Sequence, residues 1–101
     1  MSEIDALRGA IFKLHGCRAT HLETVPVHEV SQGQTIWQGE VEVFDIFEYP
    51  SGALQCFAWA YQDDDGRTQY TAVLKLPPVK IPQDAVRAAI VAKVKDERQT
   101  T

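Results

Sequence analysis

LQCFAWAYQ (residues 54–62) decides the fold, because both of its faces are apolar if the chain is extended here. Alternate side chains of a β-strand point to opposite sides of its sheet. One side of this segment is bulky and carries Phe57, Trp59 and Tyr61. The other side is small and carries Leu54, Cys56, Ala58 and Ala60. Since a strand with one face in water alternates with polar residues, the pattern predicts a central strand whose two faces both need an apolar cover.

Three further strand-like segments surround this one, and short turns join them. The four predicted strands cover residues 19–30, 35–48, 54–62 and 67–76. They contain many β-branched and aromatic residues, and turn signals at SQGQ (31–34), YPSG (49–52) and DDDG (63–66) separate them. The apolar pattern of the second segment changes phase midway, which predicts a β-bulge near Val43. Because every connection is short, we expect an antiparallel meander.

An amphipathic helix is predicted at each end of the sheet. The N-terminal apolar stripe has helical spacing and consists of Ile4, Leu7, Ile11 and Leu14, and Gly16 is placed to end that helix. The C-terminal helix starts near Pro82, and its stripe consists of Val86, Ala89, Ile90, Lys93 and Val94. The predicted fold class is α+β, a four-stranded antiparallel meander with both helices packed on one face. It forms one domain, 1–101, whose polar tail at 96–101 is expected to fray.

The turn at DDDG (63–66) determines which residues share a face. A loop of two or four residues puts the aromatic stripe on the same side as Tyr70, Ala72, Leu74 and Leu76. We expect this aromatic face to be the core beneath the helices. In the alternative, the small residues lie beneath the helices and the aromatic stripe is open. Either way one sheet face lacks a cover, and a second copy of the chain is expected to supply it in a homodimer.

Composition and charge restrict the partners. The chain has 101 residues and a net charge of −4 with scattered charges, which disfavours binding to duplex nucleic acid or to an anionic membrane. The N-terminal segment lacks the basic start and apolar run of a signal peptide, and no stretch is long enough to span a membrane. We therefore expect a cytoplasmic protein with reduced thiols at Cys17 and Cys56.

Metal and nucleophile patterns are weak in this sequence. The spacing of His15, Cys17, His21 and His28 does not match a zinc motif, so no metal and no cofactor is expected. Cys17 follows a helix C-terminus, where the dipole disfavours a thiolate. No serine stands in a nucleophile elbow, so no catalytic residue is assigned.

The carboxylates of the second strand are the stronger candidates. Glu40 and Glu42 share one face, and beside Trp37 or Trp59 they would bind a cationic ligand or perform acid–base chemistry. The small side of the third strand and Val73 form the expected subunit interface. The candidate ligand-binding or interface residues are therefore Trp37, Glu40, Glu42, Cys56, Ala58, Trp59, Ala60 and Val73.

The order of the elements resembles that of the double-stranded-RNA-binding domain, which also has helices at both ends of an antiparallel sheet. That resemblance implies RNA docking by a basic start of the last helix. In IPQDAVRAAI (81–90), Asp84 stands in this place, and only Lys80 and Arg87 are basic nearby. The resemblance therefore implies a fold without duplex RNA binding.

The hypothesis for function is a small dimeric protein that binds a small molecule or another protein. One alternative is a small enzyme that uses carboxylates, or His21 and His28, at the sheet edge. Another is a binder of single-stranded nucleic acid through exposed aromatic rings. Exposure of Trp59 would favour the nucleic-acid binder, and a carboxylate next to a histidine in a pocket would favour the enzyme.

Overall fold

The computed structural model describes residues 3–47, 52 and 54–99, and confirms the predicted order of elements. That order is α1 (Glu3–His15), β1 (Arg18–Ser31), β2 (Gln34–Phe47), β3 (Gln55–Gln62), β4 (Thr68–Leu74) and α2 (Pro82–Gln99). The strands form one antiparallel meander in the order β1-β2-β3-β4. Most of the turn predicted at 49–52 lies outside the described residues. In the described part, no helix is both long and apolar enough to cross a bilayer.

Both helices have the terminal signals that the sequence indicates. α1 ends at His15, directly before Gly16. The φ of Gly16, 71°, is the left-handed conformation that favours glycine, and the Gly16 N–H donates to the Phe12 carbonyl at 2.8 Å. α2 starts at Pro82, and the Asp84 carboxylate accepts from the backbone N–H groups of Lys80 and Ile81 at 3.0 and 3.3 Å. A side chain that reaches back to these N–H groups caps the helix.

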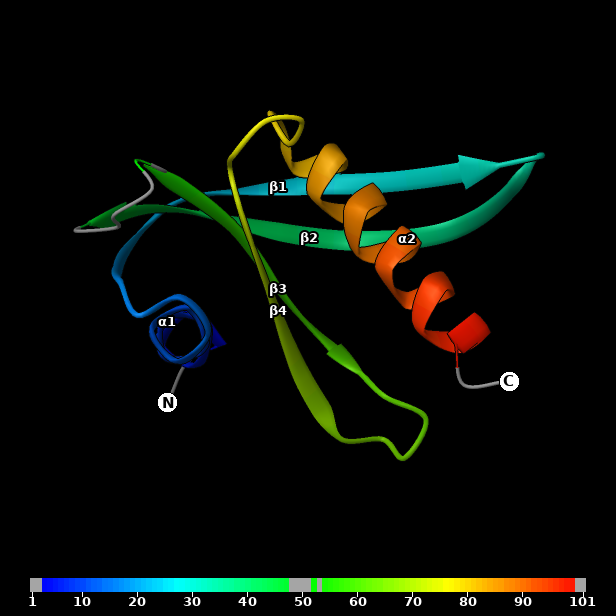
Figure 1. Ribbon diagram of the computed structural model, residues 1–101, viewed down its shortest axis with the longest axis horizontal. Coiled ribbons are helices and arrows are strands. Elements are labelled where there is room, and N and C mark those ends of the chain that lie inside the picture. Colours follow the sequence, from blue (N-terminus) through cyan, green and yellow to red (C-terminus); the bar gives the residue numbers. More distant parts are fainter. Residues whose placement is uncertain (1–2, 48–51, 53, 100–101) are drawn as a thin grey trace.

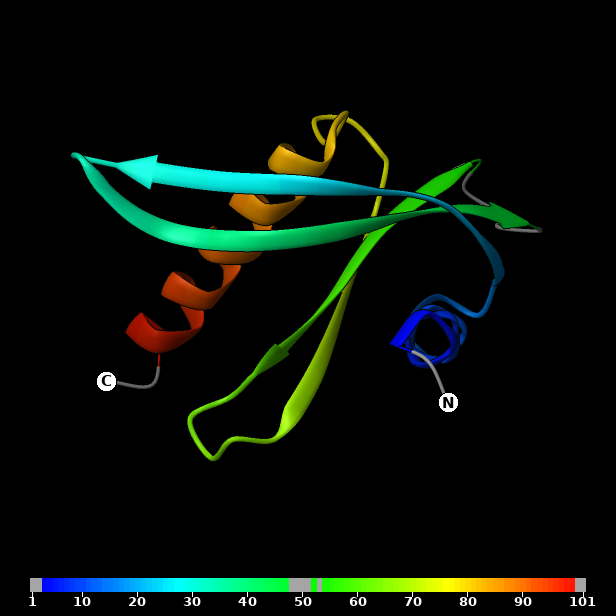
Figure 2. The same ribbon diagram turned by 180° about the vertical axis from the view of Figure 1, so that it is seen from behind.

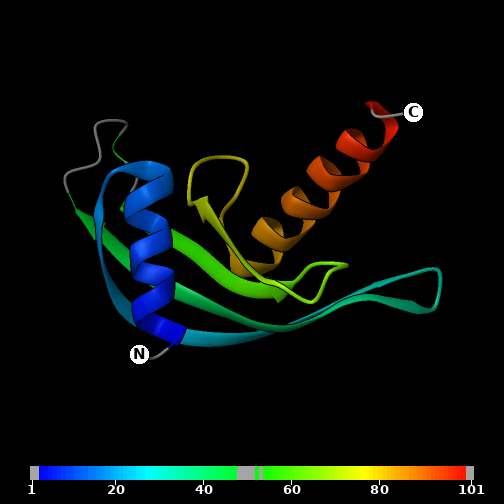
Figure 3. The same ribbon diagram turned by 90° about the horizontal axis from the view of Figure 1, so that it is seen from below.

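The two helices cover opposite faces of the sheet, so the prediction that both pack on one face is wrong. Leu7 and Ile11 of α1 pack against the small side of β3, with Cys56 and Ala58. Residues of α2, with Val86 at the centre, pack against the aromatic side. In Figure 1, α1 and α2 lie on either side of the β3–β4 hairpin, and Figure 3 shows the same separation. Both faces of β3 are therefore covered within one chain.

The phase change in β2 has a different cause from the predicted bulge near Val43. β2 is regular there, and its buried residues change parity because the helices cover opposite faces at different points along the strand. Phe44 and Ile46 face α1, whereas Val41 and Val43 face α2. The bulge is instead in β1, at Leu22.

The predicted facing of the β3–β4 hairpin is also wrong. The Gly66 N–H donates to the Asp63 carbonyl, and the Asp63 N–H donates to the Arg67 carbonyl, both at 2.9 Å. With Gly66 at a φ of 78°, this is a three-residue loop with a bulge at the glycine. An odd loop reverses the facing, so Cys56 pairs with Leu74 and Phe57 pairs with Val73.

The sheet forks where β2 leaves β3. Their pairing covers only Glu42–Asp45 against Gln55–Ala58, and ends at Glu42 and Ala58. The β1–β2 and β3–β4 hairpins then diverge (Figure 2). α2 packs between the two hairpins on one face of the sheet. On that face the Trp37 and Trp59 rings meet edge to face with centroids 5.7 Å apart.

Candidate functional site

A β-bulge in β1 brings two polar side chains to the α1 face of the sheet. His21 pairs with Phe44 and Glu23 pairs with Val43, so Leu22 is the extra residue of the bulge. Side chains after the bulge change sides relative to those before it. As a result, Thr24 points to the same face as His21.

Both side chains bind the carboxylate of Glu42 on the neighbouring strand. His21 Nε2 lies 2.8 Å from Glu42 Oε1, which requires the proton to be on Nε2, and the Thr24 hydroxyl donates to the same oxygen. The His21 ring also meets the Phe44 ring edge to face at 5.4 Å. Only 12% of the Glu42 side chain and 32% of the His21 side chain are exposed. The carboxylate is therefore fixed in position before any ligand binds.

This cluster lies at the fork of the sheet. The Ile46 N–H donates to the Leu54 carbonyl at 2.9 Å, so alternate pairs from there, including Glu42 with Ala58, exchange backbone hydrogen bonds. The next residues in that alternation are Glu40 and Ala60. Among the described residues neither has a partner across the fork, so their backbone N–H and carbonyl groups face the opening.

The structure separates the carboxylates from the tryptophans. Glu40 and Glu42 are on the α1 face, whereas Trp37 and Trp59 are on the α2 face. Trp59 is only 4% exposed, so it cannot stack on a nucleic-acid base. The predicted pairing of these carboxylates with a tryptophan is not present.

The other predicted interface residues are used inside the monomer. Cys56 and Ala58 are fully buried beneath α1, and Val73 is half-buried beneath α2. Ala60 is half-buried next to the fork. The small side of β3 is therefore not free to form the sheet-face contact that we expected between subunits.

Both cysteines are buried in the core beneath α1, and the remaining histidines bind different partners. Burial raises the pKa of the Cys56 thiol to about 12 and also raises the pKa of Cys17. His15 Nε2 binds the Ala72 carbonyl at 2.9 Å, and His28 Nε2 binds the Thr35 hydroxyl at 2.7 Å. The thiols are thus poor nucleophiles, and each histidine has a separate hydrogen-bond partner.

Sequence reasoning missed a second polar cluster, which joins α2 to β1. Glu29 is 8% exposed, accepts from Arg87 Nε at 3.0 and 3.1 Å, and accepts from Gln83 Nε2 at 2.8 Å. The Gln83 hydrogen bond, followed by Arg87, lowers the pKa of Glu29. Gln83 and Arg87 are four residues apart, on one side of a helix. This four-residue spacing was the signal in the sequence that could have predicted the cluster. The cluster holds α2 against β1, which is a structural role.

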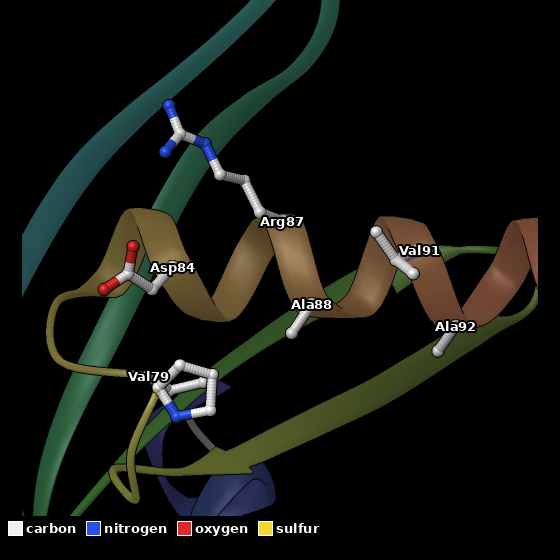
Figure 4. A pocket seen from close by; sticks show the side chains of 7 residues that line it. Val79, Asp84, Arg87, Ala88, Val91 and Ala92 are labelled. Atoms are coloured by element: carbon white, nitrogen blue, oxygen red, sulfur yellow. The ribbon is translucent and has the colours of Figure 1, made fainter.

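A groove beside α2 contains none of the sequence-predicted site residues. It is lined by Pro78, Val79, Asp84, Arg87, Ala88, Val91 and Ala92. Figure 4 shows that Arg87 points away from Ala88 and Ala92. Asp84 caps the helix and Arg87 binds Glu29, so the charged groups of the groove already have structural partners.

Comparisons with protein-family models, with curated proteins and with solved structures found no match to this chain. Function is therefore inferred from the geometry of the chain itself. Glu42, held by His21 and Thr24 beside the open fork, is the arrangement with the clearest binding chemistry: fixed negative charge, partial burial and adjacent backbone groups.

Proposed function

We propose that this protein is a small binding protein that holds a ligand with an ammonium or guanidinium group at the fork of its sheet. The observation that carries the proposal is the Glu42 carboxylate, which is mostly buried and fixed by His21 and Thr24 through one oxygen. Its second oxygen remains as an acceptor, because the hydrogen bonds that Glu42 accepts from side chains of the described residues all reach Oε1. A cation would bind there through charge-assisted hydrogen bonds.

The surroundings of Glu42 also suit a cation. The Glu40 carboxylate is on the same face of β2, and the carbonyls of Glu40 and Ala60 open toward the fork. The whole chain carries a net charge of −4, which favours the approach of a cation. A partly buried carboxylate interacts more strongly with a cation than an exposed one, because less water screens the charges. The predicted homodimer and cytoplasmic location belong to the same proposal.

Titration with n-butylguanidinium chloride tests the proposal. Two-dimensional ¹H–¹⁵N NMR at constant ionic strength should show saturable shifts for the amides of Glu40, Glu42 and Ala60. Glu42→Gln should weaken this binding at least about tenfold, a loss that corresponds to about 1.4 kcal/mol. Glu23→Gln is the matched control, because it removes the same charge from the opposite face of β1. Equal, non-saturating shifts around all acidic residues would rule the site out.

The contact between His21 and Glu42 favours acid–base catalysis as a second candidate function. A carboxylate bound to one ring nitrogen fixes the tautomer, so that the other nitrogen, Nδ1, can accept a proton. A panel of p-nitrophenyl esters provides the test. Catalysis by this pair requires turnover that His21→Gln removes and His28→Gln retains, since His28 binds only a hydroxyl. Without such a difference between the two variants, the binding role stands alone.

A further inference from the structure

The two edges of the sheet differ in how they are protected against pairing with another strand. The β1 edge contains Pro26, the bulge at Leu22 and several charged residues. Prolines, bulges and charges are the usual means of preventing edge-to-edge association. The β4 edge has the sequence TQYTAVL, with no proline and no charge. Of the two outer edges of the sheet in the described residues, the β4 edge is therefore the one that lacks such protection.

The direction of the β4 backbone groups follows from the hydrogen bonds at its two ends. Asp63 donates to Arg67, and Lys75 donates to Gln55, both at 2.9 Å, so the odd-numbered residues of β4 bond to β3. In an antiparallel pair the intervening residues direct both N–H and carbonyl outward. The backbone N–H and carbonyl groups that point away from β3 are therefore those of Thr68, Tyr70 and Ala72. The bond from His15 to the Ala72 carbonyl confirms this direction.

His15 also limits the part of the edge that a second strand can use. Its ring lies against the Ala72 carbonyl at 2.9 Å, and α1 packs over this half of β4. In the part of the chain that the structure describes, no hydrogen bond reaches the outward groups of Thr68 and Tyr70. The free edge is therefore the N-terminal half of β4, where the hairpin extends away from α1 (Figure 1).

We propose that a second copy of this chain adds its own β4 to this edge in antiparallel orientation, with the two-fold axis at Gln69. Thr68 then pairs with Tyr70 of the second copy, Tyr70 pairs with Thr68, and the bond between His15 and Ala72 is retained. An uncharged strand brings no like charges together in such a pair, and an aromatic residue opposite threonine is a favourable cross-strand neighbour. A two-fold contact also closes, and leaves no unpaired copy of the β4 edge. The homodimer is thus formed through an edge, since α1 and α2 pack on opposite faces of the central strand β3.

Sedimentation equilibrium of wild type, Tyr70→Pro and Tyr70→Phe tests the assembly. Proline removes an outward N–H and retains the bonds to β3, and prolines are tolerated on edge strands. Wild type and Tyr70→Phe should dimerise with similar affinity, and Tyr70→Pro should weaken dimerisation at least about tenfold. A wild-type monomer at 0.5 mM, or a Tyr70→Pro dimer of unchanged affinity, would overturn the proposal.

Disulfide cross-linking tests the register independently, even if Tyr70→Pro fails to fold. Residues on the axis face each other as a non-hydrogen-bonded pair about 4.5 Å apart at Cα, within the range that a disulfide bridges. Gln69→Cys should therefore form a covalent dimer on mild oxidation. Thr71→Cys is the matched control, because its two copies would be more than about 13 Å apart. Wild type, whose cysteines are buried, should not cross-link. Absence of the Gln69→Cys dimer, or equal cross-linking by Thr71→Cys, would refute this register.

Discussion

His21 and Thr24 are three residues apart on β1, yet both side chains bind the same oxygen of Glu42. In a regular strand, residues with this spacing point to opposite faces. The extra residue Leu22 removes the difference. The bulge thus has an identifiable effect, which is to fix one carboxylate with two donors from one strand.

Glu42→Gln should lower the free energy of unfolding by about 1 kcal/mol, because the hydrogen bonds to Oε1 lose the contribution of the negative charge. Urea denaturation at pH 7 measures this change. Glu40→Gln is the control on the same face of β2, and its exposed side chain should change stability by less than about 0.5 kcal/mol. Equal losses in the two variants would mean that the Glu42 cluster adds no specific stability.

Ala58→Arg should destabilise the monomer by about 3 kcal/mol or more, since the residue is fully buried beneath Leu7 and Ile11. Circular dichroism during thermal denaturation measures the loss. Ala88→Arg adds the same side chain at an exposed position of α2 and should remain close to wild type. A folded Ala58→Arg with wild-type stability would contradict the packing of α1 on this face.

Gly9→Ala should stabilise the protein by about 1 kcal/mol, the usual difference between these residues inside a helix. Gly9 is an exposed residue of α1, and an added Cβ would meet no atom within 4 Å. Chemical denaturation is the appropriate measurement. A loss of stability would show that α1 needs flexibility at this position.

Gly39→Ala should have the opposite effect. An added Cβ would lie 3.1 Å from Cη2 of Trp37, so the ring must move and its contact with Trp59 must change. Overpacking of this kind costs about 1–3 kcal/mol. Tryptophan fluorescence should shift together with the loss of stability, and Gly9→Ala provides the matched glycine-to-alanine control. An unchanged spectrum would mean that the Trp37 ring has room to adjust.

Glu29→Gln should lower the stability of the protein at neutral pH, and this loss of stability should be much smaller in acid. The pKa of Glu29 is lowered in the folded state by Gln83 and Arg87, so the folded protein holds this proton less tightly than the unfolded chain. The resulting stability is present above the ordinary value of 4.5 and is lost as the pH falls through the lowered folded pKa. Urea denaturation of wild type and variant at pH 7 and pH 3 should show the difference shrinking. Glu23→Gln is the control at an exposed position, and its stability difference from wild type should change little between these two pH values. If that difference shrank as much as it does for Glu29→Gln, the effect would come from the net charge of the protein and not from the contacts of Glu29.

The sequence was sufficient for the element order, because local signals determine it. Gly16 and Pro82 mark helix ends through their own backbone preferences, and the alternation in LQCFAWAYQ is a property of one strand. The facing of β4 relative to β3 depended on the length of the loop that ends at Gly66, since one residue more or less in the loop moves every side chain of β4 to the other side. That parity is not encoded in the strand pattern.

The candidate site was only partly predictable. Glu40 and Glu42 share a face as expected, and the bulge was predicted in the second strand, near Val43. The bulge is on β1 instead of β2, and its position decides that His21 and Thr24 meet Glu42. The partners of a carboxylate on a neighbouring strand depend on register, which no single segment specifies.

The sheet acts as a partition between two cores that share no side chain. One contains Phe44, Cys56 and Ala58, and the other contains Val43, Phe57 and Trp59. These residues nonetheless alternate along the same two strands. A disturbance on the α1 side can therefore reach the α2 side through the strand backbone, because neighbouring residues of one strand, such as Phe44 and Val43, belong to different cores. The short pairing of β2 with β3 is one place where the two cores meet through the backbone, and a ligand at the fork would bind at the end of that pairing.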